Sequence, residues 1–559
     1  MIRSTMVVTK RTPVARRSMV AAEHPLGAGA GAAILERGGN AVDAAVATAV
    51  AMTVVEPFMS TLAGGGTMLV HLARRGETLC VDFNVEAPAA AHERSYQLGE
   101  GISSTAVYAW RRVVDDANVF GPRSVAVPGS VAGLCLALER WGTMDLADVI
   151  APAIKLAEEG FIPDWYMALH TAILCQELAA FPSTARTYLR DGDYVYRTPV
   201  HNDGEVFRQP DLARSLRLLA KEGPSAFYTG AIAQAIHEEM AATGGMLTRD
   251  DLARYAPRVL PALTGTYRGL ELAFSPGATG GTTALEMLNI LAQFPKSRTT
   301  WKTPGGLHLR AEAIRRAFLD RLEHLGDPER VKAPWDALLS RAYAAKVAAG
   351  LKPRGPLSAR PVPDPWRYET AARAADCTTH LCAVDRQRNM VSLTNTAVSL
   401  WGSRMVVPGT GILLQNGMVW FDPEPGHVNS VAPGKRPLVN MVPALAFKRG
   451  APYLAVGAPG GRKIVSAIPQ VIANMVDLGD SPQAAIEAPR LHTEGGELWV
   501  DDRVGSAALA ALTRMGHPVV PTHVEPGTLY FSKPVAIRVT GKGLEAGLDP
   551  VHAAAAAGI

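Results

Sequence analysis

Cysteine is scarce in this chain of 559 residues, and neither sign of charge is in large excess. The five cysteines are scattered and no two form a CxxC pair, which argues against a disulfide framework and against a zinc site. Lys and Arg total 56 against 52 Asp and Glu, a formal net charge of +4. This balance argues against a dedicated nucleic-acid-binding protein, which would carry a basic stripe. We expect the local basic excess at residues 10–17 to be a solvated tail.

A long uninterrupted apolar run is also missing. The most apolar stretch, residues 41–57, carries Asp43 and Glu56 and is rich in Ala and Val, so we interpret it as a buried helix and not a membrane span. Residues 1–30 lack the continuous apolar segment of a secretory signal peptide. We therefore expect no membrane partner and a cytoplasmic location.

Motifs of several common enzyme classes do not occur. The sequence has no HExxH zinc motif, no GxSxG nucleophile elbow and no GxxxxGK[ST] phosphate loop. Residues 27–32 match GxGxxG/A loosely, but His24 and Pro25 interrupt the strand that a dinucleotide site needs before it. The sequence thus predicts neither a metal nor a cofactor.

The order of patterns along the chain predicts a mixed α/β protein. Apolar residues make up 48% and charged residues 19%, a globular balance. Helical patterns lie mainly in the first two-thirds and β patterns mainly near the end. We expect helices at 28–36, 40–54, 130–141, 146–159, 226–243, 307–325, 464–478 and 483–487, a hairpin at 68–82, a Pro- and Arg-rich connector at 352–368, and strands at 378–385 and 390–398.

Thr378 opens a β pattern shortly after the proline-rich connector. A threonine hydroxyl is a poor nucleophile without a neighbouring base, and cleavage before the threonine would supply one, its own α-amine. That amine has a pKa near 8, close to what a general base needs at neutral pH. If residues 378–385 and 390–398 pair about Gln387, Thr378 lies opposite Thr396, about 5 Å away. The alternative is that both are ordinary strand threonines, since threonine favours strands.

A glycine-rich turn, Gly457 to Gly461, follows one predicted strand and precedes a helix. Backbone N–H groups at such a turn can bind an oxyanion, aided by the helix N-terminus. The alternative is a simple tight turn.

Taken together, these segments resemble the γ-glutamyltranspeptidase family of N-terminal-nucleophile hydrolases. The resemblance extends over nearly the whole chain. It rests on the ordered motifs Gly38 to Ala45, Val127 to Gly129, Pro152 to Ala157, Tyr267 to Gly269, Ala311 to Ala313, Asp320-Arg321, Gly326 to Pro328, Thr378 to His380, Gly411 to Leu414, Lys435 to Pro437 and Pro459 to Gly461.

The resemblance implies a four-layer αββα fold and a proenzyme that cleaves itself between Cys377 and Thr378. The products would be a large chain, 1–377, and a small chain, 378–559, which stay associated as a heterodimer. Thr378 would be the nucleophile, first toward the Cys377 carbonyl and then toward substrate amides. Thr396 aligns with the family's second threonine, and Gly460 and Gly461 with its oxyanion-hole glycines.

Departures from the family pattern concern the substrate. The arginine that holds the glutamyl α-carboxylate is replaced by Asn84, and the residues that hold the α-amino group fall on Gly417 and Trp420. The family's Asn two residues after the second threonine is Val398. The Ser-Ser pair falls on Val439 and Asn440. The α-amino cradle is therefore missing, and an ammonium buried there without partners would cost several kcal/mol.

This pattern is similar to that of family members that remove glutaryl groups from cephalosporins. We expect an amidohydrolase for ω-carboxyacyl amides such as glutaryl-7-aminocephalosporanic acid, with weak γ-glutamyl transfer. Arg404 and Arg462 are the candidates for binding the acyl carboxylate; the alternative is that either is a surface residue. Other hypotheses are a γ-glutamyltranspeptidase or glutathione hydrolase, a small-amide hydrolase of the oxamate type, and an unprocessed binding protein.

Overall fold

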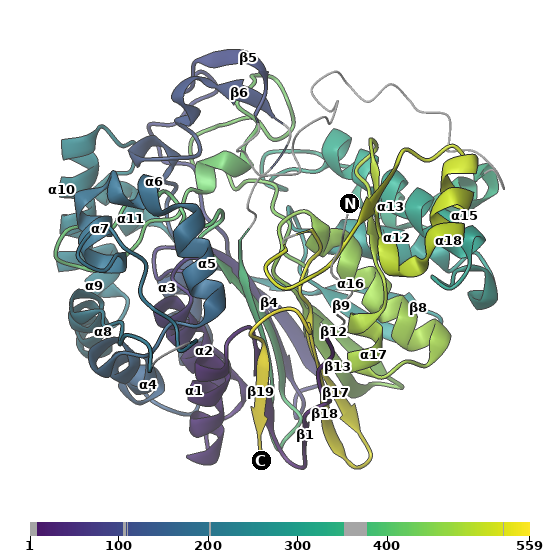
Figure 1. The fold of residues 1–559 in the computed structure, drawn as a ribbon, viewed down its shortest axis with the longest axis horizontal. Helices are drawn as coiled ribbons and strands as arrows, with labels where there is room; N and C mark the ends of the chain where they lie inside the picture. The colour runs from purple at the N-terminus through teal and green to yellow at the C-terminus, as the bar shows by residue number, and fades with distance from the viewer. Residues whose placement is uncertain (1–7, 104–107, 109, 201–202, 352–376, 529) are drawn as a thin grey trace.

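Two seven-stranded sheets lie face to face, with helices on both outer sides (Figure 1). The structure is a computed structural model that describes residues 8–103, 108, 110–200, 203–351, 377–528 and 530–559. The expected connector at 352–368 lies outside these residues. The layering confirms the predicted αββα fold.

The first sheet joins strands from both ends of the chain. Its order is β1 (Val14–Ala15), β18 (Gly543–Leu548), β17 (Val535–Thr540), β13 (Ala451–Gly457), β12 (Ala444–Lys448), β9 (Leu270–Phe274) and β8 (Leu263–Tyr267). All of these pairs are antiparallel.

The second sheet is also antiparallel and contains the predicted Thr378 hairpin. Its order is β19 (Ala555–Gly558), β2 (Met19–Ala22), β10 (Thr379–Val384), β11 (Met390–Thr396), β3 (Gly65–Leu72), β4 (Glu77–Phe83) and β7 (Arg258–Pro261). Strands from residues 1–377 and 378–559 are intermixed here, because the adjacent strands β10 and β11 lie between β2 and β3. The sequence pattern had suggested that strands lie mainly near the end of the chain. The structure shows that they also occur in its first half, as β2, β3, β4 and β7.

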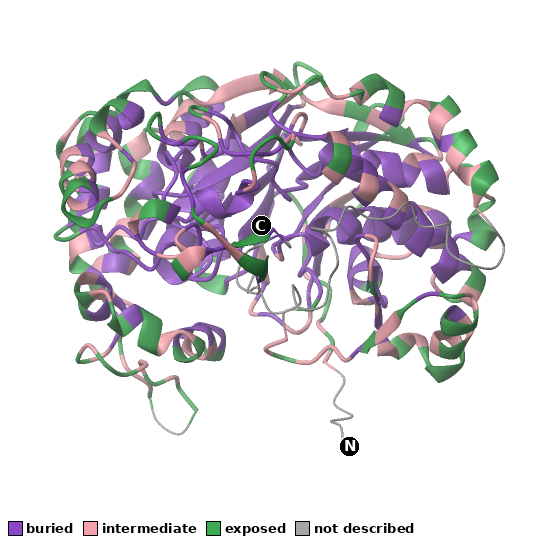
Figure 2. Ribbon diagram, turned by 90° about the horizontal axis from the view of Figure 1, so that it is seen from above, coloured by how far each residue is buried: buried purple, intermediate pink, exposed green. Residues whose placement is uncertain are grey.

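The outer helices fall into two groups, one on each sheet (Figure 1). Over the second sheet lie α1 (Pro25–Glu36), α2 (Ala41–Val55), α3 (Ser130–Trp141), α4 (Leu146–Glu159), α5 (Trp165–Ile173), α7 (Pro182–Tyr188), α8 (Pro210–Glu222), α9 (Ser225–Tyr228) and α10 (Ala231–Thr243). Over the first lie α12 (Gly281–Leu291), α13 (Pro304–His324), α16 (Lys463–Ala473), α17 (Pro482–Glu487) and α18 (Ser506–Arg514). Apolar cores fill each helix–sheet interface and the space between the sheets, and buried residues accordingly occupy the centre of Figure 2.

Local sequence explains α2. Asn40 Oδ1 accepts hydrogen bonds from the N–H groups of Val42 (2.8 Å) and Asp43 (3.1 Å), and Asp43 Oδ2 accepts one from Asn40 N–H (2.7 Å). This capping box satisfies N–H groups that a helix start leaves unpaired. Every residue of α2 is buried, as expected for a predominantly apolar helix inside a large protein, and its Asp43 is engaged in the capping box. No helix in the described ranges is both long and apolar enough to span a membrane.

Two local predictions were wrong. The helix expected at 226–243 is broken into α9 and α10 around Gly230, where the N–H groups of Thr229 and Gly230 both turn back to Ser225 O. The helix expected at 464–478 is confirmed, because α16 (Lys463–Ala473) continues without a break as a π-helical turn to Leu478. The basic stretch 10–17 is not a free tail, because it forms β1 and because Lys10 Nζ donates to the carbonyls of His552 and Ala554.

Candidate active site

The β10–β11 hairpin has the predicted register. Thr379 pairs with Asn395 and His380 with Thr394, and the same register places Thr378 opposite Thr396. Thr378 Oγ1 donates a hydrogen bond to Thr396 Oγ1 over 3.2 Å. The sequence-based juxtaposition of the two hydroxyls is confirmed.

Both hydroxyls converge on the carbonyl of Cys377. Thr396 Oγ1 donates to Cys377 O over 3.0 Å, and Thr378 Oγ1 also contacts that oxygen at hydrogen-bond distance. All three residues are buried, with Thr378 4% exposed. The hydroxyl of Thr378, a second hydroxyl and the bond expected to be cut therefore form one compact group.

Val398 completes this group through its backbone. Its N–H donates to Thr396 Oγ1 (2.8 Å), and its carbonyl accepts the N–H of Cys377 (3.4 Å). Val398 has φ +83°, a left-handed conformation that a β-branched residue adopts only under strain. The strained backbone of Val398 thus holds both Cys377 and Thr396 beside the Thr378 hydroxyl.

The glycine turn lies at the matching end of the first sheet. β13 ends at Gly457, and a Cβ there would lie only 2.1 Å from His380 Cε1, so Gly457 packs directly on a side chain two residues from Thr378. Gly460 (φ +124°) and Gly461 (φ +55°) adopt conformations that favour glycine. Within the described part of the chain, neither of their N–H groups has an acceptor, and both precede α16. This geometry suits an oxyanion site.

Apolar side chains form one wall beside Val398. Trp420, which ends the short 3-10 helix η6 (Gly417–Trp420), lies in the same buried apolar cluster as Val398 and Val439. Asn84 is buried but engaged locally: its Oδ1 accepts from Val85 N–H (2.9 Å) and its Nδ2 reaches Pro437 O at 3.4 Å. Asn84 therefore joins the end of β4 to the segment at Pro437 through its side-chain amide.

The two candidate arginines differ in their partners, and both are buried, so neither is a surface residue. The Arg404 guanidinium lies 3.9 Å from the centre of the Phe120 ring and has no carboxylate partner among the described residues. Burial lowers the pKa of Arg404 to about 10. Arg462 instead forms a buried ion pair with Glu494 (3.0 Å), which also bonds His492. Of the two, only Arg462 has an ion pair within the described residues, although the charge of Glu177 also acts on Arg404.

Two residues that the sequence analysis did not identify as site residues, Tyr108 and Arg321, contact the Asn440 side chain. Its Oδ1 accepts from the Tyr108 hydroxyl (2.7 Å) and from Arg321 Nη2 (3.2 Å). Burial raises the pKa of Tyr108, and the charges of Arg321 and Arg462 oppose that rise. The one available signal was Arg321 itself, which stands in the Asp-Arg motif of the family resemblance.

A second unexpected group is buried beside Thr379. Thr379 Oγ1 donates to Glu56 Oε2 (3.3 Å), and Glu56 is 1% exposed. Burial raises the pKa of Glu56 to about 8. Nearby, Lys533 Nζ lies 3.2 Å from the Tyr166 hydroxyl, and burial lowers the pKa of Lys533 to about 8. Glu56 was visible in the sequence only as a charge inside an apolar run.

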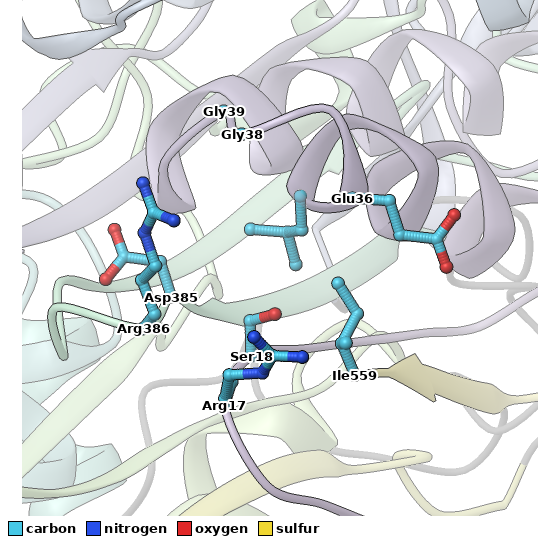
Figure 3. A pocket seen from close by; sticks show the side chains of 9 residues that line it. Arg17, Ser18, Glu36, Gly38, Gly39, Asp385, Arg386 and Ile559 are labelled. Carbon is cyan, nitrogen blue, oxygen red and sulfur yellow. The ribbon is translucent and has the colours of Figure 1, made fainter.

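Two cavities among the described residues lie away from Thr378. One of about 200 Å³ is lined by residues including Arg17, Glu36, Asp385 and Arg386, at the end of β10 opposite to Thr378 (Figure 3). Another of about 180 Å³ lies against α7 and the start of α8. The reactive group is thus separate from both.

Among the residues that the structure describes, two side-chain clusters have the composition of a metal site. His308 and Glu312 of α13 approach His517, with His308 Nδ1 2.7 Å from His517 Nε2, but Arg315 already places a cation 3.5 Å from Glu312. Asp422, Glu424 and His427 form a more exposed group. Neither cluster includes a residue of the Thr378 group.

Comparison with known proteins gives the family. A family model described as gamma-glutamyltranspeptidase matches residues 27–559. The chain belongs to the γ-glutamyltranspeptidase family. It is therefore an amide-hydrolysing enzyme of the N-terminal-nucleophile type, as its motifs predicted.

Relatives within the γ-glutamyltranspeptidase family include both acylases and glutathione hydrolases. The chain is 38% identical to the Acylase ACY 1 proenzyme of Pseudomonas sp. (strain SE83), over 91% of this chain and 88% of that protein. It is 33% identical to the glutathione hydrolase proenzyme of Bacillus subtilis (strain 168), over 93% and 88% respectively. The crystal structure of a cephalosporin acylase from Bacillus halodurans superposes with a TM-score of 0.86 at 28% identity, covering 100% of this chain and 98% of that one.

Proposed function

We propose that this protein is a self-cleaving acylase that removes an ω-carboxyacyl group, such as glutaryl, from an amine such as 7-aminocephalosporanic acid. The observation that carries the proposal is the pair of hydroxyls, Thr378 and Thr396, on the Cys377 carbonyl. The names of two relatives, the Acylase ACY 1 proenzyme and the cephalosporin acylase from Bacillus halodurans, support an acylase activity.

Self-cleavage uses the hydroxyl pair, because the α-amine of Thr378 is still bound in the peptide. Thr378 Oγ bonds to the Cys377 carbonyl carbon, its proton passes to Thr396 Oγ, and the Thr396 proton passes to the carbonyl oxygen. The C–N bond then breaks, the nitrogen takes the proton from the new hydroxyl, and an ester results. Water hydrolyses the ester, which separates chain 1–377 from chain 378–559. The hydrogen bonds from Thr378 to Thr396 and from Thr396 to Cys377 already follow this path.

Substrate turnover repeats the chemistry with a free amine. The α-amine of Thr378 now takes the hydroxyl proton, and Thr378 Oγ attacks the substrate amide carbon. Gly460 and Gly461 N–H groups stabilise the oxyanion. As the tetrahedral intermediate collapses, the amide C–N bond breaks, the protonated α-amine gives its proton to the departing nitrogen, and an acyl-enzyme remains. The α-amine then takes a proton from water, whose oxygen bonds to the acyl carbon; the ester C–O bond breaks and the proton passes to Thr378 Oγ.

The acyl preference follows from the apolar wall. An α-ammonium needs a carboxylate partner when buried, and Val398 and Trp420 offer none. A glutaryl group lacks that ammonium but keeps the distal carboxylate, which Arg404 can pair with. Acyl groups of this type therefore fit better than γ-glutamyl.

In this proposal the two chains stay together because strands of both chains form one sheet. β10 and β11 of the small chain are inserted between β2 and β3 of the large chain. Separation would break main-chain hydrogen bonds on both edges of the β10–β11 pair.

The deciding experiment compares hydrolysis of glutaryl and γ-glutamyl anilides at matched concentrations. Faster glutaryl release supports the acylase, and faster γ-glutamyl release means a transpeptidase or glutathione hydrolase, the activity named for other relatives. Trp420→Asp is expected to raise the γ-glutamyl rate relative to glutaryl, with Trp420→Phe as the apolar control. Intact mass under denaturing conditions tests processing, and a chain that stays uncut would leave only the binding-protein hypothesis.

A further inference from the structure

The register of β13 and β17 continues past the ends of both strands. The two strands pair antiparallel without a shift, and their end pair is Gly457 with Val535. In an antiparallel pair, a step forward along one strand matches a step back along the other. Three steps after Gly457 along the chain is Gly460, and three steps before Val535 is Ser532. The register therefore predicts that Ser532 lies opposite the first of the two oxyanion-site glycines.

Contacts confirm that the segment around Ser532 packs on the glycine turn. Lys533 N–H donates to Pro459 O over 3.1 Å. A Cβ placed on Gly460 would lie 2.7 Å from Ser532 Cα and 3.0 Å from Ser532 Oγ. On its other side, the Ser532 carbonyl accepts a hydrogen bond from Arg490 Nη2 over 3.0 Å. The backbone that carries this serine is thus fixed against the turn.

The Ser532 hydroxyl is buried and has no protein partner. Ser532 is 0% exposed, and within the described ranges its Oγ forms no hydrogen bond. Because a buried polar group without a partner is destabilising, such groups usually face water or a ligand. The N–H groups of Gly460 and Gly461 also lack acceptors in those ranges. Three donors without acceptors therefore gather at one turn.

The separation of these donors suits one shared acceptor. A Cβ lies about 2.5 Å from the nitrogen of its own residue, so the 3.0 Å contact puts Ser532 Oγ within about 5.5 Å of Gly460 N. Two donors that each bond one oxygen over about 2.9 Å, at a tetrahedral angle to each other, are about 4.7 Å apart. An oxygen at the turn can therefore accept from the amide and the hydroxyl together. The substrate carbonyl oxygen, which becomes negative as Thr378 attacks, is such an acceptor.

We propose that Ser532 is a catalytic residue whose hydroxyl donates a third hydrogen bond to the oxyanion, beside the N–H groups of Gly460 and Gly461. This inference rests on the proposed function and deepens its turnover step. A hydrogen bond to a charged oxygen is stronger than one to a neutral carbonyl, so the bond strengthens as the oxyanion forms and raises kcat. It does not depend on the acyl group, because every amide substrate forms the same oxyanion.

Ser532→Ala tests the assignment, since it removes the hydroxyl and keeps the Cβ. We expect kcat to fall at least tenfold, as for loss of one oxyanion donor, with KM changed less than threefold. The loss should be equal for glutaryl anilide and for pentanoyl anilide, which has the same chain length but no carboxylate. Self-cleavage, followed by intact mass, should continue, because the Cys377 carbonyl is bound by Thr396 and not by this turn. A variant that stays uncut would overturn the assignment.

Thermal stability separates this role from a structural one. Because the Ser532 hydroxyl has no partner in the described ranges, Ser532→Ala should keep or raise Tm while kcat falls. Ser215→Ala is the matched control, since that buried hydroxyl donates to Thr410 O (2.7 Å) from the outer helix α8. The control should lower Tm and leave kcat unchanged.

An unchanged kcat in Ser532→Ala, or a fall in kcat that comes with a lower Tm, would overturn the proposal. If wild type prefers γ-glutamyl anilide, the acylase proposal fails. The same comparison of kcat on that substrate would still test Ser532, because the oxyanion is common to both reactions.

Discussion

Thr378 Oγ1 lies 3.2 Å from Thr396 Oγ1, and Thr396 Oγ1 lies 3.0 Å from the carbonyl oxygen of Cys377. The second hydroxyl is thus placed to accept a proton from the first and to give one to the carbonyl. This arrangement exists while the chain is continuous, before any free amine can act as base. The first prediction tests it.

Thr378→Ala should abolish both self-cleavage and amide turnover, because it removes the attacking oxygen. Thr396→Ala should slow self-cleavage by about 10²-fold or more, the usual contribution of a positioned proton-transfer group. Intact mass against time measures both, with Thr378→Ser and Thr396→Ser as hydroxyl-retaining controls. Normal processing of Thr378→Ala would reject the nucleophile assignment.

Val398 should show an unusual order of stability. Its side chain is buried, so both Ala and Gly variants lose packing, but only glycine relieves the left-handed strain of about 1–2 kcal/mol. We expect Val398→Gly to be at least as stable as Val398→Ala in urea denaturation. Val439 is buried in the same cluster without a positive φ, and there glycine should be the less stable variant. The ordinary order at both positions would show that Val398 is unstrained.

Arg404→Ala should raise KM for carboxylated acyl groups more than for neutral ones, by about tenfold, because the charge it removes has no partner within the protein's described residues. Steady-state kinetics on glutaryl and pentanoyl anilides measure the difference. Arg503→Ala is a suitable control, since that arginine is paired with Asp501 in another part of the fold. Equal changes for both substrates in Arg404→Ala would exclude a role in carboxylate binding.

Glu56 should make stability fall as pH rises. Burial raises its pKa from 4.5 to about 8, so between these values the folded protein keeps a proton that the unfolded chain has lost. Stability therefore decreases across this window. Glu56→Gln removes the effect and keeps an oxygen for Thr379, so its Tm should exceed that of wild type increasingly from pH 5 to pH 8. Glu36→Gln, on an exposed residue, should follow wild type. A constant difference in Tm across this range would contradict the buried, protonated Glu56.

Local patterns were sufficient to predict the features that depend on neighbours in sequence. Asn40 and Asp43 identify the start of α2, and a five-residue connection, 385–389, centred on Gln387 fixes the register that brings Thr378 to Thr396. The αββα fold and the family came from ordered motifs along the whole chain.

Features that depend on distant segments could not be predicted in this way. The contact between Arg321 and Asn440 spans 119 residues, and that between Glu56 and Thr379 spans 323. Arg462 had the right residue type and position for a carboxylate, but its charge is taken by Glu494, 32 residues further on. The residue type alone did not show which of the two arginines forms an ion pair within the protein.

The insertion of β10 and β11 between β2 and β3 also affects how the proposed two-chain enzyme would unfold and refold. Before cleavage, a denatured chain refolds by an intramolecular reaction whose rate does not depend on concentration. After cleavage, the same sheet must be rebuilt from two molecules that diffuse apart, and the β10–β11 hairpin must insert between strands that cannot pair correctly without it. The two-chain enzyme that we propose would then be protected by its barrier to unfolding and not by its ability to refold. The proposed cleavage would therefore make refolding depend on concentration, so that dilution favours irreversible loss of the folded enzyme.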